Sequence, residues 1–375
     1  MPQTKTTVTK KKTSQDSVKK SSTSKKIPLK EEDIIALNPN KKNVPKWEDV
    51  KQDMKDFKTP DQVAKEQNLE KIIEIKNLVK NYGKLHVLKN VNLNIYGTQD
   101  IAVIGANGAG KSTISEIIAL VKEKTSGEVK YSWGDTKRQI SRGLGIQFQE
   151  STYPEGYRII DLIMFYLEVN GINIVKKGEE DKLVIKKMQC DECKKSFFAK
   201  VSYDNPYYEY TCRKKKCGYT HKYNFSDKFI TEDKFNYLLE TFQVNGITHK
   251  MANAVSGGQQ QRFNILLGVL HQPKFLILDE VSTGLDVESR AEIKSFVKQV
   301  MKENQGTLYL VTHNMDEVEF LSKRITIIDA GRVVDDVMIS DVWKIGLTVA
   351  EYVDSFFDYR DRQLKASGKS KNDQS

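Results

Sequence analysis

Three short apolar runs mark the centre of the chain, at residues 101–104, 275–278 and 308–311. Each run is followed by a polar loop and then by apolar positions at helical spacing. Runs that are apolar at every position indicate strands buried on both faces, which is typical of a parallel sheet covered by helices. From about Lys71, β-branched residues alternate with polar ones and predict further strands. We therefore expect an α/β core that begins near residue 71.

The remaining sequence divides into segments of different texture. Residues 1–30 contain nine lysines, a single acid and almost no apolar side chain, which predicts a disordered Lys-rich tail. Residues 31–70 mix charges with a few apolar positions and are expected to form a weakly helical extension. We assign the core domain to 71–335, a polar, aromatic block inserted within it to 173–225, and a C-terminal helix with a basic tail to 336–375.

Composition limits the classes of protein that fit the chain. Of its 375 residues, 38% are apolar, enough for one large core or two modest ones. No apolar stretch approaches the roughly 20 residues that span a bilayer, and no secretory signal is readable. We therefore expect a cytoplasmic protein that does not cross a membrane unaided.

The net charge of +10 at first suggests an acidic partner such as nucleic acid or an anionic membrane. The positive charge is concentrated at 1–30 (+8), 176–222 (+6) and 360–375 (+3), so the remainder carries −7. An acidic core with basic appendages favours contact of those appendages with an anionic membrane surface or with an unidentified partner.

Residues 105–113, GANGAGKST, fit the pattern G-x-x-x-x-G-K-[ST] between an apolar strand and an amphipathic helix. Glycines let backbone N–H groups face an anion, and Lys111 adds a full charge near the β and γ phosphates of a nucleotide. Ser112 would hold Mg²⁺. A plain glycine-rich turn would explain the glycines but not the Lys-Ser-Thr that follows. The predicted phosphate site comprises Gly105, Asn107, Gly108, Ala109, Gly110, Lys111, Ser112 and Thr113.

The second apolar run ends in two acids, Asp279 and Glu280. Burying acids is costly unless they face a cation or a reactive water. We expect Asp279 to bind Mg²⁺ and Glu280 to orient or deprotonate the water that attacks the nucleotide. Taken alone, the pair could also be an ordinary strand end that reaches solvent. Beside a phosphate loop, the two acids favour nucleotide hydrolysis.

The segment AVSGGQQQR at 254–262 decides between kinds of nucleotide hydrolase. It resembles the signature of the ATP-binding cassette (ABC) superfamily, and it precedes Asp279 in that family's order. Physically it is another anion site, because a serine caps a helix whose glycines leave the first amides unshielded. A simple capped helix is the alternative. The residues that would bind nucleotide here are Ser256, Gly257, Gly258 and Gln259.

The resemblance covers about 71–335 outside the inserted block and implies further roles. Tyr82 looks like the aromatic on which the family stacks adenine. Gln149 resembles the glutamine that touches Mg²⁺ and reports to a membrane partner, although nearby Gln147 leaves the register open. Asp286 resembles the acid at the dimer junction, and His313 the histidine that contacts the γ phosphate. The resemblance thus implies catalysis by Glu280, His313, Lys111 and Gln149, with Mg²⁺ held by Ser112, Gln149 and Asp279. Val255 and Val281 depart from the family pattern without removing a ligand.

The family's fold is a P-loop NTPase ABC-type ATPase domain, with a mainly parallel sheet, an antiparallel β subdomain and a helical subdomain. The resemblance, strongest to exporter-like ATP-binding subunits, implies Mg²⁺-dependent ATP hydrolysis. It implies a second ABC ATPase subunit as partner, in a homo- or heterodimer, and a separate transmembrane permease. The expected location is cytoplasmic and peripheral, at the inner face of the cell membrane. The alternative is a soluble ABC ATPase that acts on DNA, because the excision-repair ATPase also carries inserted zinc modules.

The inserted block contains all four cysteines of the chain, in the pattern C-x-x-C, 18 residues, then C-x4-C. This spacing is close to that of a zinc ribbon, in which two hairpin tips supply four thiolates to one structural metal. The candidate Zn²⁺ ligands are Cys190, Cys193, Cys212 and Cys217. Reduced structural cysteines or redox pairs are the alternative. Aromatic and basic residues around them could bind nucleic acid, or serve as the core that a small ribbon needs.

Overall fold

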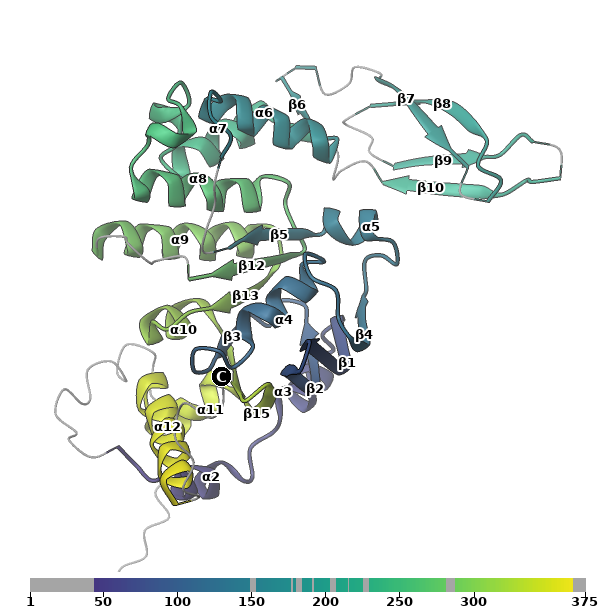
Figure 1. Ribbon diagram of the computed structural model, residues 1–375. Helices are drawn as coiled ribbons and strands as arrows, with labels where there is room; N and C mark the ends of the chain where they lie inside the picture. Colours follow the sequence, from purple (N-terminus) through teal and green to yellow (C-terminus); the bar gives the residue numbers. More distant parts are fainter. Residues whose placement is uncertain are drawn as a thin grey trace, which may run out of the picture. The chain divides into compact units, whose positions relative to one another are not determined.

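The computed structural model describes residues 44–148, 153–176, 178–179, 184–190, 192–202, 207–214, 216–224, 229–280 and 287–366. The Lys-rich tail lies outside them. Figure 1 labels most of the helices and strands. In chain order the elements are α2 (Trp47–Met54), α3 (Pro60–Glu66), β1 (Lys71–Tyr82), β2 (Leu85–Tyr96), β3 (Ile101–Ile104), α4 (Lys111–Ile118), β4 (Ser126–Tyr131), α5 (Lys137–Arg142), β5 (Leu144–Gln147), α6 (Ile159–Asn170), β6 (Asn173–Val175), β7 (Val184–Gln189), β8 (Ser196–Val201), β9 (Tyr207–Thr211), β10 (Thr220–Asn224), β11 (Phe229–Thr231), α7 (Glu232–Thr241), two 3-10 turns (Asn245–Ile247 and Ala252–Ala254), α8 (Gly257–Leu270), β12 (Phe275–Asp279), α9 (Val287–Glu303), β13 (Thr307–Val311), α10 (Met315–Leu321), β14 (Arg324–Asp329), β15 (Arg332–Met338), α11 (Ile339–Lys344) and α12 (Val349–Ala366).

Six of the described strands form the central sheet, in the order β15-β14-β3-β13-β12-β5. Neighbouring strands pair in parallel, except that β15 runs antiparallel to β14. Alternate side chains of β12 enter two different cores: Leu276 and Leu278 pack with α8 and α9, whereas Phe275 and Ile277 pack with α4. Burial on both faces explains why the sequence of this strand is apolar at every position. The predicted α/β fold with a mainly parallel sheet is confirmed.

The register of the sheet aligns the carboxyl ends of three strands. Asp279, the last residue of β12, pairs with Val311, the last residue of β13. Val311 in turn pairs with Val103 of β3. Because the strands are parallel, the segments that follow them leave at one edge of the sheet. These segments are the phosphate loop, Glu280 and His313.

A second, antiparallel sheet has the strand order β2-β1-β4. Its apolar face supplies Ile73, Ile75 and Leu78 to the same core that contains the apolar face of α4. The helix of the phosphate loop is therefore held between two sheets. This sheet confirms the antiparallel β region that the resemblance implies.

Helices α6, α7, α8 and α9 share the other large core, and a buried histidine fastens part of it to the sheet. His271, just after α8, is bonded through Nδ1 to the Tyr166 hydroxyl of α6 at 2.8 Å and through Nε2 to the Leu144 carbonyl of β5 at 2.9 Å. Burial lowers the pKa of His271 to about 4, so the ring is neutral at physiological pH. A neutral ring suits this place, because it donates to the carbonyl and accepts from the phenol.

The segment before the core docks on it through α2 and α3. The ring of Trp47 meets the rings of Tyr352 and Phe356 of α12 edge to face, at centroid distances of 5.2 and 5.3 Å. These contacts tie the two ends of the described chain into one apolar cluster.

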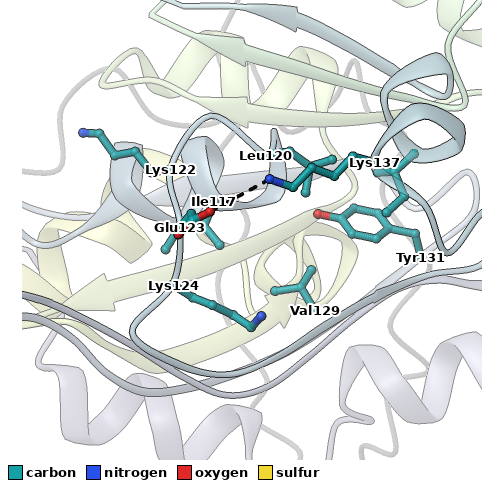
Figure 2. Close-up of a pocket in the computed structure, with 9 residues that line it drawn as sticks. Ile117, Leu120, Lys122, Glu123, Lys124, Val129, Tyr131 and Lys137 are labelled. Carbon is teal, nitrogen blue, oxygen red and sulfur yellow. Dashed lines mark ion pairs between the residues drawn. The ribbon is translucent and has the colours of Figure 1, made fainter.

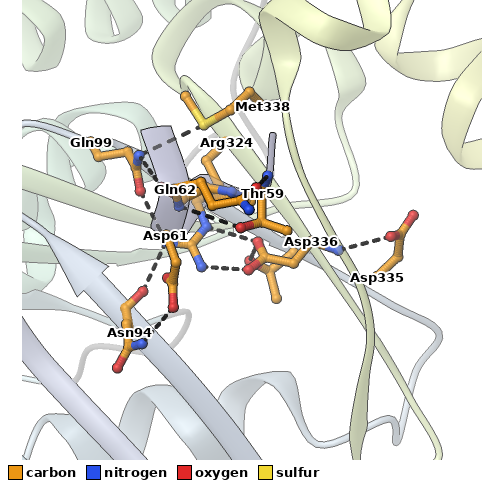
Figure 3. Close-up of polar contacts among 11 residues, drawn as sticks. Thr59, Asp61, Gln62, Asn94, Gln99, Arg324, Asp335, Asp336 and Met338 are labelled. Atoms are coloured by element: carbon orange, nitrogen blue, oxygen red, sulfur yellow. Dashed lines mark hydrogen bonds and ion pairs between the residues drawn. The ribbon is translucent and has the colours of Figure 1, made fainter. Parts of the chain in front are cut away.

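Polar contacts join α3 to the sheets (Figure 3). Asp61 accepts a 2.7 Å hydrogen bond from Asn94 Nδ2 of β2. The fully buried guanidinium of Arg324 is paired with Asp336 and also donates to Gln99 Oε1 at 2.9 Å. A buried charge is tolerated here because its donors find acceptors.

Among the described residues, no helix combines the length and hydropathy that a membrane span requires.

Candidate nucleotide site and cysteine cluster

The phosphate loop connects β3 to α4 in a conformation that requires glycine. Gly110, immediately before α4, has φ +104°, a region closed to other residues, and a Cβ there would press on Leu88. A Cβ on Gly105 would clash with the carbonyl oxygen of Ile328. The loop thus passes close to neighbouring backbone before entering the helix. The structure places all the predicted residues 105–113 in this one turn and the start of α4.

The side chain of Lys111 folds back over the loop. Its Nζ donates to the carbonyl oxygens of Gly105 at 2.8 Å and Ala106 at 3.1 Å. Burial lowers the pKa of the ammonium group, while Asp279 and Glu280 act in the opposite direction. The cation is therefore held beside the loop and close to both acids. A cation in this position can neutralise the charge of an anion placed against the loop amides.

The structure brings Ser112 and Asp279 together across the edge of the sheet. Asp279 is buried, and burial raises the pKa of its carboxyl group, whereas a hydrogen bond from the Ser112 hydroxyl lowers it. A hydroxyl and a carboxylate oxygen from two elements are the kind of ligands that Mg²⁺ takes, alongside water and phosphate oxygens. The donor set therefore fits the predicted cation.

Glu280 and His313 form a second pair at the same edge. Their Oε1 and Nε2 atoms are 3.5 Å apart, and the side chain of His313 is half exposed. Glu280 has φ +52°, and its N–H donates to the Val311 carbonyl at 2.8 Å. This left-handed conformation, costly for a glutamate, sets the carboxylate at the end of the strand. Backbone strain of this kind is typical of functional sites.

The signature segment begins α8 with a capping box. The N–H of Gln259 donates to Ser256 Oγ at 3.3 Å, and the N–H of Ser256 donates to Gln259 Oε1 at 3.2 Å. Gly257 and Gly258 follow the cap without side chains over the first turn. The predicted cap is confirmed, and the helix N-terminus faces outward from Ser256 with a partial positive charge.

Tyr82 ends β1 with 43% of its surface exposed. The ammonium groups of Lys80 and Lys122 lie 4.7 and 5.8 Å from the centre of its ring. An exposed ring with cations beside it can accept a nucleotide base and attract its phosphates. Neither lysine was predicted from the sequence: Lys80 lies two residues before Tyr82, whereas Lys122 lies far from it along the chain.

Two predicted residues, Gln149 and Asp286, lie outside the described residues. Gln147, the other candidate for the glutamine register, is buried at the end of β5. Its Nε2 donates to the Phe148 carbonyl at 2.7 Å, and its Oε1 has no hydrogen-bond partner in the described part of the chain.

The four cysteines lie at the tips of two hairpins, β7-β8 and β9-β10. Their Sγ atoms all lie within 4.8 Å of one another, with Cys190 to Cys217 at 3.7 Å and Cys193 to Cys212 at 3.6 Å. Zinc–sulfur bonds of about 2.3 Å in a tetrahedron place sulfur atoms about 3.8 Å apart. The cluster therefore has the dimensions of a structural Zn²⁺ site.

One neighbour of the cluster was not predicted. His221 of β10 is buried, and its Nε2 lies 3.1 Å from the Cys190 sulfur. A ring N–H at this distance stabilises a thiolate and fixes its orientation. His221 lies four residues after Cys217, in the strand that leaves that hairpin tip. This closeness in sequence was the signal that could have pointed to a histidine beside the cluster.

Comparison with known proteins gives one family and several similar structures. Residues 88–283 match the family described as "ABC transporter". A curated relative, the sulfate/thiosulfate import ATP-binding protein CysA of Mannheimia succiniciproducens, is 26% identical over 70% of this chain and 60% of its own length. The chain thus spans about 60% of the length of the curated relatives it matches.

Two solved structures share the fold. An ATP-binding subunit of an ABC transporter matches 77% of this chain and 99% of its own, with a TM-score of 0.56 and 18% identity. A dimeric bacterial ABC transporter cassette matches 71% of this chain and 98% of its own, with a TM-score of 0.50 and 20% identity. None of these proteins supports the alternative of an ATPase that acts on DNA.

Proposed function

Because the chain belongs to the ABC transporter family, we propose that it is the ATP-binding and ATP-hydrolysing subunit of an ABC transporter. In this role it couples ATP-driven closure of a dimer to transport through a separate permease. The motifs suggested exporter-type subunits, whereas relatives such as CysA, PotA and MetN are named for import. ATP hydrolysis is common to both, so the proposal does not depend on the direction of transport.

The observation that carries the proposal is the meeting of three chain segments at one edge of the central sheet. The phosphate loop with Lys111, the Ser112–Asp279 pair and the Glu280–His313 pair all follow strands whose carboxyl ends are in register. A phosphate-binding loop opposite a cation site and a carboxylate is the arrangement that phosphoryl transfer to water needs.

Each residue then has a role in hydrolysis. The amides of 105–113 and Lys111 bind the β and γ phosphates, and Tyr82 stacks against the adenine. Ser112, Asp279 and Gln149 hold Mg²⁺, which when bound neutralises charge on the phosphates. Glu280 orients the attacking water and accepts its proton, while His313 contacts the γ phosphate. The 3.5 Å separation of Glu280 and His313 supports these roles, because it sets the proposed base beside the proposed γ-phosphate contact.

The proposed partners follow from the single set of motifs in the chain. Ser256, Gly257, Gly258 and Gln259 would bind the nucleotide held by a second ABC ATPase subunit, identical or related, with Asp286 at the junction. The permease, a separate chain, would place the complex at the cytoplasmic face of the membrane. There the basic segments 1–30 and 360–375 could contact anionic lipid.

We also propose that the cysteine cluster binds one structural Zn²⁺. The sulfur separations of 3.6 and 3.7 Å support it, as does the placement of the four thiols on two hairpins. On this proposal the ATPase domain extends over 71–335, and the zinc module is an insertion at 173–225.

Replacing Glu280 with Gln tests the proposed hydrolysis. The Glu280→Gln variant of the full chain should lose ATP turnover by about 100-fold or more, because an amide accepts no proton from water. It should still bind ATP, since the phosphate loop and Lys111 are unchanged. Steady-state phosphate release and binding of a fluorescent ATP analogue measure the two properties separately.

The Glu48→Gln variant is the matched control, because Glu48 is exposed on α2 and outside the site. Its turnover should equal that of the unaltered protein. Unchanged ATP hydrolysis in the Glu280→Gln variant would show that Glu280 is not the group that accepts the proton of the attacking water. Binding of DNA that stimulates hydrolysis, without any association with membranes, would overturn the transporter proposal.

A further inference from the structure

A pocket of about 270 Å³ lies beside the end of α4 (Figure 2). Strand β4 and helix α5 supply other parts of its wall. The wall is largely apolar, with contributions from Ile117, Val129, Tyr131 and Ile140. The Tyr131 hydroxyl donates to the Ile118 carbonyl at 2.7 Å, so this phenol is already satisfied. The volume is just below the range of pockets for drug-sized ligands, which indicates a small ligand.

The rim of the pocket is positively charged. Lys122, Lys124 and Lys137 border it, with Glu123 as the acid among them. Lys122 is paired with Glu116 at 2.7 Å. Lys137 and Glu123 are 3.9 Å apart and both strongly exposed, so their interaction is weak. In the described part of the chain Lys124 has no ion pair. An anionic group would therefore find at least one cation that is not already neutralised.

Backbone strain adds an independent observation. Leu120 follows the end of α4 with φ +61°, in the left-handed region where a helix usually ends in glycine. The other described non-glycine residues with positive φ are polar, apart from the small Ala330. The side chain of Leu120 lines the pocket. Leu120 is a leucine in a strained conformation, and its side chain completes an apolar wall of the pocket. Strain at such a position indicates that the wall binds a ligand.

We propose that this pocket binds a small amphiphilic anion, a molecule with a compact apolar body and one carboxylate or phosphate group. The apolar body packs against Tyr131, Val129 and Leu120, and the anionic group meets Lys124 and Lys137 at the rim. The site is separate from the loop at 105–113, which contributes no residue to it. Lys122 borders both this pocket and the ring of Tyr82, so the site adjoins the nucleotide site.

The proposal is tested by titrating the full chain with 2-naphthoate and measuring the heat of binding by calorimetry. We expect saturable binding that also changes the fluorescence of Trp133. Its ring lies 5.3 Å from that of Tyr131, and its Nε1 donates to the Ile140 carbonyl. The cation 2-naphthylmethylammonium has a similar body and opposite charge, and it should bind at least about fivefold more weakly. Inorganic phosphate, without an apolar body, should not displace naphthoate, whereas 2-naphthyl phosphate should.

Variants locate the binding. The double variant Lys124→Gln, Lys137→Gln should weaken naphthoate binding by about fivefold, because both cations are removed. Leu120→Asn keeps a residue that tolerates the left-handed conformation but removes the apolar wall, and should also weaken binding. Lys130→Gln is the matched control, since Lys130 is exposed on β4 and does not line the pocket. Its affinity should be unchanged.

Three results would each overturn the proposal: absence of saturable binding, equal affinity for the naphthyl anion and cation, or unaltered affinity in the lysine double variant and Leu120→Asn. The titrations contain no ATP. Their outcome is therefore independent of whether the chain hydrolyses ATP as proposed.

Discussion

Two regions of the molecule bring side chains together in different ways. One is the edge of the central sheet with the phosphate loop, Asp279 and His313, which we call the nucleotide edge, and the other is the cysteine cluster. At the nucleotide edge, Lys111, Asp279 and His313 come from distant parts of the sequence, and the register of buried parallel strands aligns them. In the cluster, all four cysteines lie within 190–217 at the tips of two hairpins. The first site is therefore organised by the hydrophobic core, whereas the second has little core of its own. We expect the first to persist without ligand and the second to depend on its metal.

Removing the proposed zinc should give the largest effect and would separate the two regions most clearly. Chelation should release near one Zn²⁺ per chain and unfold the module, because metal binding contributes on the order of 10 kcal/mol to such folds. Metal analysis and limited proteolysis within 184–224 measure these changes. Binding of a fluorescent ATP analogue should be unaltered, because the core does not need this metal.

The variant Cys190→Ser should reproduce the effect of chelation, and Ser196→Ala on the same hairpin should not. A purified protein that contains no metal yet resists proteolysis in this region would contradict the prediction. Loss of nucleotide binding on chelation would also break the comparison, by showing that the two regions are not independent.

Many residues of the nucleotide edge could be predicted from the sequence, although they come from segments far apart in the chain. Apolar runs report strands buried on both faces, and the segment after each such strand has a known destination at the carboxyl edge. The contact between Ser112 and Asp279 needs the strand order, which periodicity does not contain. The left-handed backbone of Glu280 has no sequence signal at all, because glutamate rarely adopts it.

The cysteine cluster was predictable for the opposite reason. Its spacing is local, so C-x-x-C and C-x4-C indicate two hairpin tips without knowledge of the fold. His221 was missed because its ring reaches Cys190 across two hairpins. Lys122 beside Tyr82 was missed for the same physical reason. Contacts between elements depend on packing that no short pattern encodes.

The variant Asp279→Asn should have the next largest effect and act on activity rather than on the fold. ATP turnover should fall by about 100-fold or more, because a neutral amide holds Mg²⁺ poorly beside the phosphates. Burial raises the pKa of Asp279 above its ordinary value of 3.8, so its ionised form costs stability in the folded protein. Without added Mg²⁺ or nucleotide, the unaltered protein should therefore lose stability relative to Asp279→Asn as the pH rises above 3.8.

Phosphate release and melting temperature across pH measure the two effects of this substitution. Asp233→Asn, at an exposed position of α7, is the matched control and should change neither. A large drop in the melting temperature of Asp279→Asn at neutral pH would contradict the prediction. Such a drop would mean that the nucleotide edge, like the cysteine cluster, depends on its functional side chains to fold.

The smallest effect is expected from His221→Phe, which keeps a buried ring and removes the hydrogen bond to the Cys190 sulfur. Its Nε2 lies 3.1 Å from Cys190, while the ring also packs edge to face against Tyr219 at 4.5 Å. Loss of such a neighbour lowers metal affinity about 10- to 100-fold in other sites. Competition with a chromophoric chelator measures this affinity, and the exposed His86→Phe serves as control. Equal zinc affinity in His221→Phe and the unaltered protein would show that backbone geometry alone orients the thiolates. In that case the cysteine cluster, like the nucleotide edge, would be positioned by its backbone framework rather than by neighbouring side chains.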